Sequence, residues 1–119
     1  MREVVIVSGA RTAIGNYLGS LAGINAVQLG MIALKGAVEK AGIDKNSIQE
    51  LAAGHVNQAG SPGNTARHIA MGFELPAESF AFTVHQQCAS SMRAAEILSQ
   101  DIMLGKIDLG AVVGVESMS

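Results

Sequence analysis

The feature that most constrains the fold is a set of short apolar segments without the polar alternation of a half-exposed strand. Val4-Val5-Ile6-Val7 is an uninterrupted β-branched run, and Leu109–Val115 is apolar throughout. Such segments are typical of strands that are buried on both faces of a parallel sheet. Helical segments separate them along the chain, which indicates crossover connections. The sequence therefore predicts an α/β fold with crossover helices and a mainly parallel, four-stranded sheet, whose other two strands are Leu51–Val56 and Ser79–Val84.

Three helices are expected between and after these strands. In the first, apolar residues recur at spacings of three and four, and Gly42 follows as a C-terminal stop. A shorter helix is expected over Thr65–Met71, beginning near Asn64. The third is expected to begin at or near Cys88. The residues that define the first helix are Val27, Met31, Leu34, Val38 and Ala41, and those that share a face of the third are Ser91, Ala95, Leu98 and Ile102.

The composition and charge of the chain argue against several classes of function. A chain of 119 residues predicts one domain, and a net charge of −2 without a basic cluster argues against a nucleic-acid surface. One cysteine cannot form an internal disulfide, which fits a reducing compartment. The N-terminus lacks a signal-peptide layout, and no apolar run is long enough to span a membrane, so we expect a soluble, cytoplasmic protein. The three histidines have no ligand-type spacing, so no metal site is predicted; they are His55, His68 and His85.

Cys88, the only cysteine, is the candidate catalytic residue because of its position. It follows the Ser79–Val84 strand and the polar link His85-Gln86-Gln87, and it precedes a helix. Unpaired N–H groups and the positive end of the helix dipole converge there, so the thiol is expected to ionise more readily and to act as a nucleophile. A structural role is the alternative, since free cysteine usually behaves as a small apolar residue. His85 is near in sequence, but spacing alone assigns no base.

Four stretches of the chain form a recognisable set. They are VVIVSGARTAIGNYLGSL, GHVNQAGSPGNTARHIAM, HQQCASSMRAAE and VGVESMS. The set resembles the N-terminal part of the thiolases, in particular the acetyl-CoA acetyltransferases, in the same order and spacing. The resemblance extends over essentially the whole chain, so residues 1–119 are expected to be an incomplete thiolase-like N-terminal domain. Ketoacyl synthases and hydroxymethylglutaryl synthases are related, but they do not usually combine the ARTAIG opening with the ESMS ending.

The resemblance implies a reaction for Cys88. In thiolases the cysteine thiolate attacks an acyl-CoA thioester, and the acyl-enzyme passes its acyl group to a second acetyl-CoA or to free CoA. The cysteine's own N–H and one from a much later segment hold the oxyanion. The implied function is acyl transfer between CoA thioesters, by Claisen condensation or thiolysis, through an acyl-Cys88 intermediate and without a further cofactor. The implied partners are acyl-CoA or CoA, and either further copies of the chain or a complementary C-terminal thiolase chain.

Two residues beside the nucleophile depart from the family pattern. The family usually has Asn where His85 stands and Gly where Ser91 stands, so Ser91 is expected to crowd the site or to shift the helix start. The family's activating His, second Cys and most CoA contacts belong to later segments. The isolated chain is therefore expected to be inactive or very weak, since one oxyanion donor alone is worth about 2.7–4 kcal/mol. The alternative function is a non-catalytic, truncated thiolase-like domain that serves as an association module.

Overall fold

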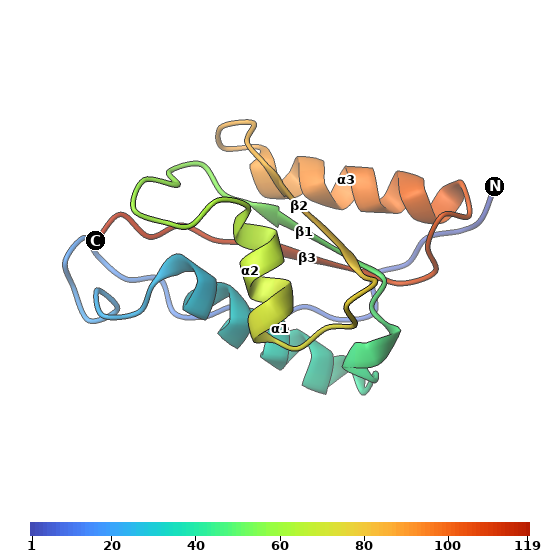
Figure 1. Ribbon diagram of the computed structural model, residues 1–119, viewed down its shortest axis with the longest axis horizontal. Coiled ribbons are helices and arrows are strands. Elements are labelled where there is room, and N and C mark those ends of the chain that lie inside the picture. The colour runs from blue at the N-terminus through green and yellow to red at the C-terminus, as the bar shows by residue number, and fades with distance from the viewer.

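The computed structural model describes residues 1–119, in which a three-stranded parallel sheet lies between helices (Figure 1). The strand order is β2-β1-β3, so the chain adds β2 on one side of the first strand and then crosses to add β3 on the other. A 3-10 turn, Lys45–Ser47, precedes the first strand. The bounds are α1 Ala26–Ala41, β1 Glu50–Gly54, α2 Thr65–Gly72, β2 Phe80–Val84, α3 Ser90–Met103 and β3 Gly110–Gly114.

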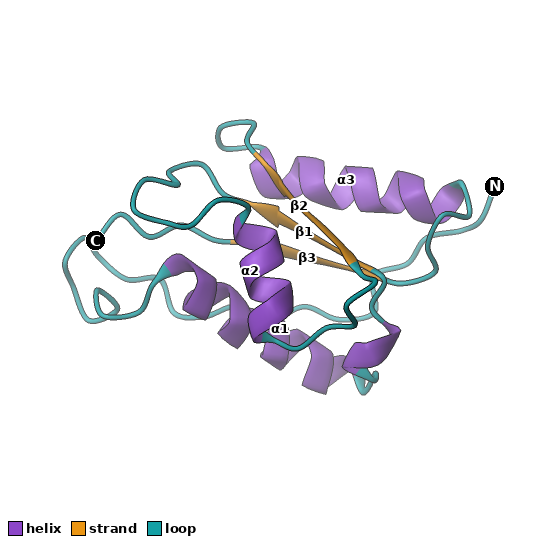
Figure 2. Ribbon diagram, viewed as in Figure 1, coloured by secondary structure: helices purple, strands orange, loops and turns teal.

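The helices are divided between the two faces of the sheet. α3 covers one face, and α1 and α2 cover the other, as Figure 2 shows. Successive residues of the central strand serve the two sides, because side chains alternate along a strand: Leu51 packs toward α1 and α2, whereas Ala52 packs toward α3. The larger cluster consists of Leu34, Ile48, Leu51, Ile69, Ala70, Leu75 and Val113, and the smaller one of Ala52, Ala94, Leu98 and Ile107.

Capping residues explain where the first two helices begin and where α1 ends. Asn25 accepts a hydrogen bond from the Gln28 N–H and its own N–H donates to the Gln28 side chain, which completes a capping box. Gly42 ends α1 in the left-handed conformation with φ 68°, as the sequence predicts. Asn64 caps α2 through the Arg67 N–H. The predicted elements from residue 26 onward are thus confirmed, with strand ends shifted by one or two residues.

The prediction of a fourth strand at Val4–Val7 is wrong. Residues 1–16 form no regular secondary structure, and Val5, Ile6 and Val7 are exposed. Both sides of the central β1 are already paired, by β2 and by β3. A β-branched run becomes a strand only where a neighbouring strand pairs with it and packing covers it. Val4–Val7 pairs with no strand, and three of its four side chains are exposed, so its strand propensity is not realised.

The parallel register brings the carboxyl ends of all three strands to one edge. Gly54, the last residue of β1, is level with Val84 of β2 and with Gly114 of β3. The segments that follow the three strands at this edge are residues 55–64, 85–89 and 115–119. In open parallel sheets ligands bind beyond this edge. The site described next lies there.

Candidate functional site

A cavity of about 270 Å³ opens at the carboxyl edge of the sheet and includes Cys88. Its walls come from the ends of β1 and β3, the segments that follow them, and the start of α3. The lining residues are Gly54, Val56, Gln87, Cys88, Ser90, Ser91, Gly114, Val115 and Glu116. The structure thus brings the predicted nucleophile to a hollow that is built by three separate parts of the chain.

Cys88 lies in a tight loop between β2 and α3, and its side chain is exposed. The prediction that the helix begins at or near Cys88 is off by two residues, because α3 begins at Ser90. The preceding residue, Gln87, has φ 50°, a left-handed conformation that is uncommon for a residue with a side chain. The Ser90 hydroxyl accepts from the Gln86 N–H at 2.8 Å and donates to the Gln87 carbonyl at 2.6 Å. These bonds hold the turn that presents Cys88, so the strained residue is supported by its neighbours.

The start of α3 offers free backbone donors. Ala89 occupies the N-cap position, and no side chain caps the helix. The N–H groups of Ser91 and Met92 donate to no backbone carbonyl, and neither does the N–H of Cys88. Unpaired donors and the helix dipole together favour negative charge at this end. Cys88 lies two residues before this helix start and lines the same cavity as Ser90 and Ser91.

No side chain that could act as a general base forms a hydrogen bond with Cys88. Its sulfur forms no hydrogen bond, and His85, the nearest histidine in sequence, is exposed and makes no side-chain hydrogen bond. His68 is exposed on α2, and His55 is buried at the end of β1. The structure does not bring any of the three histidines together, and no group of three His, Cys, Asp or Glu side chains is arranged to hold a metal ion.

Ser91 lies against two glycines of the sheet. A Cβ added to Gly54 would lie 2.6 Å from Ser91 Oγ and 2.7 Å from Ser91 Cα, and closer still to its backbone N. A Cβ added to Gly114 would lie 3.1 Å from Ser91 Cβ and closer to its Oγ. The first turn of α3 can therefore approach the sheet only because both strands end in glycine. The serine that departs from the family pattern is accommodated by this pair of glycines.

Glu116 is a site residue to which sequence reasoning assigned no role. Its carboxylate accepts the N–H of Val56 at 3.1 Å and the N–H of Asn57 at 2.6 Å. It therefore ties the segment after β3 to the segment after β1, both of which line the cavity. The sequence could have indicated Glu116 as a site residue because it comes directly after an apolar strand. Residues at that position meet at the carboxyl edge of a parallel sheet.

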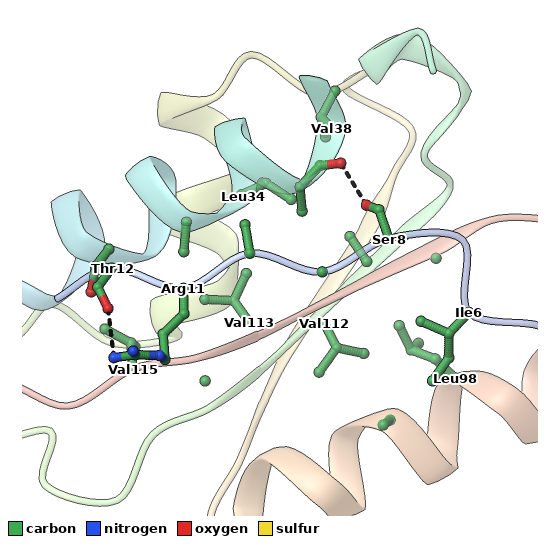
Figure 3. A pocket seen from close by; sticks show the side chains of 18 of the residues that line it. Ile6, Ser8, Arg11, Thr12, Leu34, Val38, Leu98, Val112, Val113 and Val115 are labelled. Carbon is green, nitrogen blue, oxygen red and sulfur yellow. Dashed lines mark hydrogen bonds between the residues drawn. The ribbon is translucent and has the colours of Figure 1, made fainter. Parts of the chain in front are cut away.

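A larger cavity, of about 1290 Å³, lies between the N-terminal segment, α1, α3 and β3. Figure 3 shows Leu34 and Val38 of α1 on one side of it and Val112 and Val113 of β3 on another. Its walls are mainly apolar, and Cys88 is not among them. Arg11, a candidate ligand contact in the sequence, bonds only to the Thr12 carbonyl at 3.0 Å. Size alone favours this cavity, but Cys88 and the free backbone donors at the start of α3 are at the smaller one.

Glu50 has a shifted pKa, but it lies at the start of β1, whereas the Cys88 cavity is at the other end of that strand. Burial, followed by a hydrogen bond and charge repulsion from Asp101, raises the pKa of Glu50 from 4.5 to about 7, and Lys106 opposes the shift. Glu50 begins β1, whereas the Cys88 cavity is at its end. The shifted pKa therefore belongs to a structural cluster.

Stability should consequently fall as pH rises through the pKa of Glu50. The folded pKa is the higher one, so the contribution of Glu50 is fully present below about pH 4.5 and is lost as pH rises past about 7. Relative to the parent, Glu50→Gln should gain about 2–3 kcal/mol of unfolding free energy over this range. Urea unfolding at a series of pH values measures this gain. Glu78→Gln, an exposed carboxylate, is the control, and an equal pH dependence in parent and Glu50→Gln would contradict the assignment.

The comparisons with known proteins identify the family of the chain. Residues 4–119 match the family described as thiolase, N-terminal domain. The chain is 49% identical over 116 residues to a cytosolic acetyl-CoA acetyltransferase of Gibberella zeae, with 98% of this chain and 29% of the relative aligned. It is 44% identical over 119 residues to the human mitochondrial acetyl-CoA acetyltransferase, with 100% and 28% aligned. The chain thus spans less than a third of the length of these relatives.

Solved structures give the same result for the fold. The acetyl-CoA acetyltransferase of Syntrophomonas wolfei aligns with 87% of this chain and 26% of its own, at 46% identity and a TM-score of 0.83. The Acat5 thiolase of Ascaris suum, in complex with coenzyme A, aligns with 95% and 30%, at 34% identity and a TM-score of 0.92. None of the helices has the length and apolar composition that crossing a bilayer requires.

Proposed function

Because the chain belongs to the thiolase family, we propose that it contributes the nucleophile for acyl transfer between CoA thioesters, and that this nucleophile is Cys88. The observation that carries the proposal is the position of Cys88, exposed in a cavity beside an uncapped helix start. The relatives are acetyl-CoA acetyltransferases, and the similar Ascaris thiolase is complexed with coenzyme A. These names support CoA thioesters as the substrates.

The proposed step forms one thioester and breaks another. The Cys88 thiolate attacks the carbonyl carbon of acetyl-CoA, the bond from that carbon to the CoA sulfur breaks, and CoA leaves as a thiolate that takes up a proton. The unpaired N–H of Cys88 is one donor for the oxyanion that forms during the attack. The acetyl group then passes to a second acetyl-CoA or returns to CoA. These steps use no cofactor apart from the CoA substrates.

The base that activates Cys88 is proposed to come from outside these 119 residues. No His, Asp or Glu of the chain forms a hydrogen bond with the sulfur. A complementary C-terminal thiolase segment, in the same polypeptide or in a partner chain, fits this requirement. Residues 1–119 are then a thiolase N-terminal domain that supplies the nucleophile and one wall of the site.

Mass spectrometry after incubation with acetyl-CoA tests the proposal. We expect an acetyl adduct on Cys88 when a C-terminal thiolase segment is added, and little or none with the chain alone, because no base is then present. Cys88→Ser is the matched control for the adduct site. A chain that binds the segment and never becomes acetylated would instead support a non-catalytic association module and would overturn the proposed function.

A further inference from the structure

His55 is a buried histidine whose two ring nitrogens have different surroundings. Its side chain has no exposed surface, and Nδ1 lies 2.7 Å from the Thr65 hydroxyl at the start of α2. Nε2 is buried and has no hydrogen-bond partner. Buried polar atoms are normally satisfied, so an unpaired one needs an explanation. Nothing in the proposed acyl-transfer chemistry uses this residue.

The group that faces Nε2 is Glu116. Its Oε1 atom lies 3.9 Å from Nε2, too far for a hydrogen bond but within range of an electrostatic contact. The same carboxylate accepts the N–H groups of Val56 and Asn57. Val56 and Glu116 both line the cavity of Cys88, whereas His55 lies behind that wall. His55 therefore does not line the cavity itself, but it faces Glu116, which does.

This arrangement determines which ring nitrogen carries the proton. A carboxylate only accepts hydrogen bonds, so it favours N–H at the nitrogen that faces it, which is Nε2. Nδ1 is then an acceptor, and the Thr65 hydroxyl, which rotates freely, donates to it. In the opposite tautomer, Nε2 would present a lone pair to the carboxylate of Glu116. The Nε2–H form is the one that agrees with both neighbours.

We propose that His55, as the Nε2–H tautomer, is a positioning residue for the Cys88 cavity and acts through Glu116. Anchored by Thr65 on α2, it directs a donor at the carboxylate that clamps the Val56–Asn57 backbone to the segment after β3. The clamp fixes part of the wall of the Cys88 cavity, and reacting groups must be held within fractions of an ångström for efficient transfer. The inference rests on the proposed function of Cys88 for its catalytic consequence only.

A pair of substitutions separates the two ring nitrogens. His55→Gln places an amide N–H near the position of Nε2, whereas His55→Asn reaches only as far as Nδ1 and loses the donor that faces Glu116. Glu116→Gln keeps the size of the side chain but leaves a single acceptor oxygen for two backbone N–H groups. Glu78→Gln, another exposed glutamate, controls for the loss of a negative charge.

Two readouts test the clamp without reference to catalysis. Ring-nitrogen NMR shifts of the parent should identify His55 as the Nε2–H tautomer. Amide hydrogen exchange at Val56 and Asn57 should become about tenfold faster or more in Glu116→Gln, since hydrogen bonds to a charged acceptor are lost. His55→Asn should accelerate exchange in the same direction, His55→Gln should stay close to the parent, and Glu78→Gln should leave exchange unchanged. Acetylation of Cys88 with the C-terminal segment present should slow in the same order.

An Nδ1–H tautomer, or unchanged exchange at Val56 and Asn57 in Glu116→Gln, would overturn the inference. If His55→Asn does not fold, the tautomer and the Glu116→Gln measurement decide, because Glu116 is partly exposed and its replacement is tolerated more easily. The proposed function of Cys88 and the proposed role of His55 can be contradicted independently of each other. The expected tautomer and exchange without any acetylation of Cys88 would leave the clamp in place and remove the function.

Discussion

Replacing Cys88 with alanine should lower acyl transfer from acetyl-CoA by at least about 10³-fold, because the proposed acyl-enzyme forms on Cys88, the only cysteine of the chain. Release of CoA, followed with a thiol reagent in the presence of the C-terminal segment, measures the rate. The substitution should leave the unfolding transition almost unchanged, since the side chain is exposed and makes no hydrogen bond.

Cys88→Ser is the companion variant because it keeps the shape of the side chain. A hydroxyl is a far weaker nucleophile than a thiolate at neutral pH, so Cys88→Ser should be nearly as inactive as Cys88→Ala. Transfer rates within tenfold of the parent in both variants, with the fold intact, would show that the sulfur does not carry the acyl group.

Replacing Gly54 with alanine should destabilise the fold by about 2–4 kcal/mol, because the added methyl group meets the backbone of Ser91. Backbone atoms cannot rotate away, so α3 must shift from the sheet. Chemical denaturation gives the loss in unfolding free energy. Gly63→Ala is the matched control, since a Cβ at Gly63 has no atom within 4 Å and its φ is not positive.

A double-mutant cycle with Ser91→Gly identifies the contacting atoms. At Gly114 the added methyl group meets only the side chain of Ser91, so Ser91→Gly should restore most of the stability lost in Gly114→Ala. At Gly54 the backbone of Ser91 is also in the way, and rescue should be small. Equal rescue at both glycines would contradict the close approach of the helix backbone to β1.

Most elements after residue 25 were predictable because their signals are local. The periodicity from Val27 to Ala41 specifies α1, and Gly42 supplies the left-handed residue that ends it. The start of α3 was less predictable. Ser90 and Ser91 are good N-cap residues by type, yet Ala89 takes that position while the Ser90 hydroxyl bonds back to the preceding turn. A serine has several local partners, and tertiary contacts decide among them.

The position of Cys88 could be predicted from the sequence, but the walls of its cavity could not. Cys88 follows a strand and precedes a helix, which a local pattern can indicate. The hydrogen bonds from the N–H groups of Val56 and Asn57 to Glu116 join residues that are 60 and 59 positions apart, and no spacing rule connects them. The same holds for the contact of Ser91 with Gly54 and Gly114. Such contacts depend on strand order and register, which the sequence does not specify residue by residue.

The unpaired segment near the N-terminus has a practical consequence for work in solution. Val5, Ile6 and Val7 are 67%, 93% and 62% exposed, and the outer edges of β2 and β3 carry no neighbouring strand. An exposed, uncharged β-branched segment and unpaired sheet edges both favour strand pairing between molecules. Each copy of the chain therefore has both a segment that can form a strand and a sheet edge with which such a segment from another copy can pair. We therefore expect the chain to self-assemble into β-rich aggregates at high concentration.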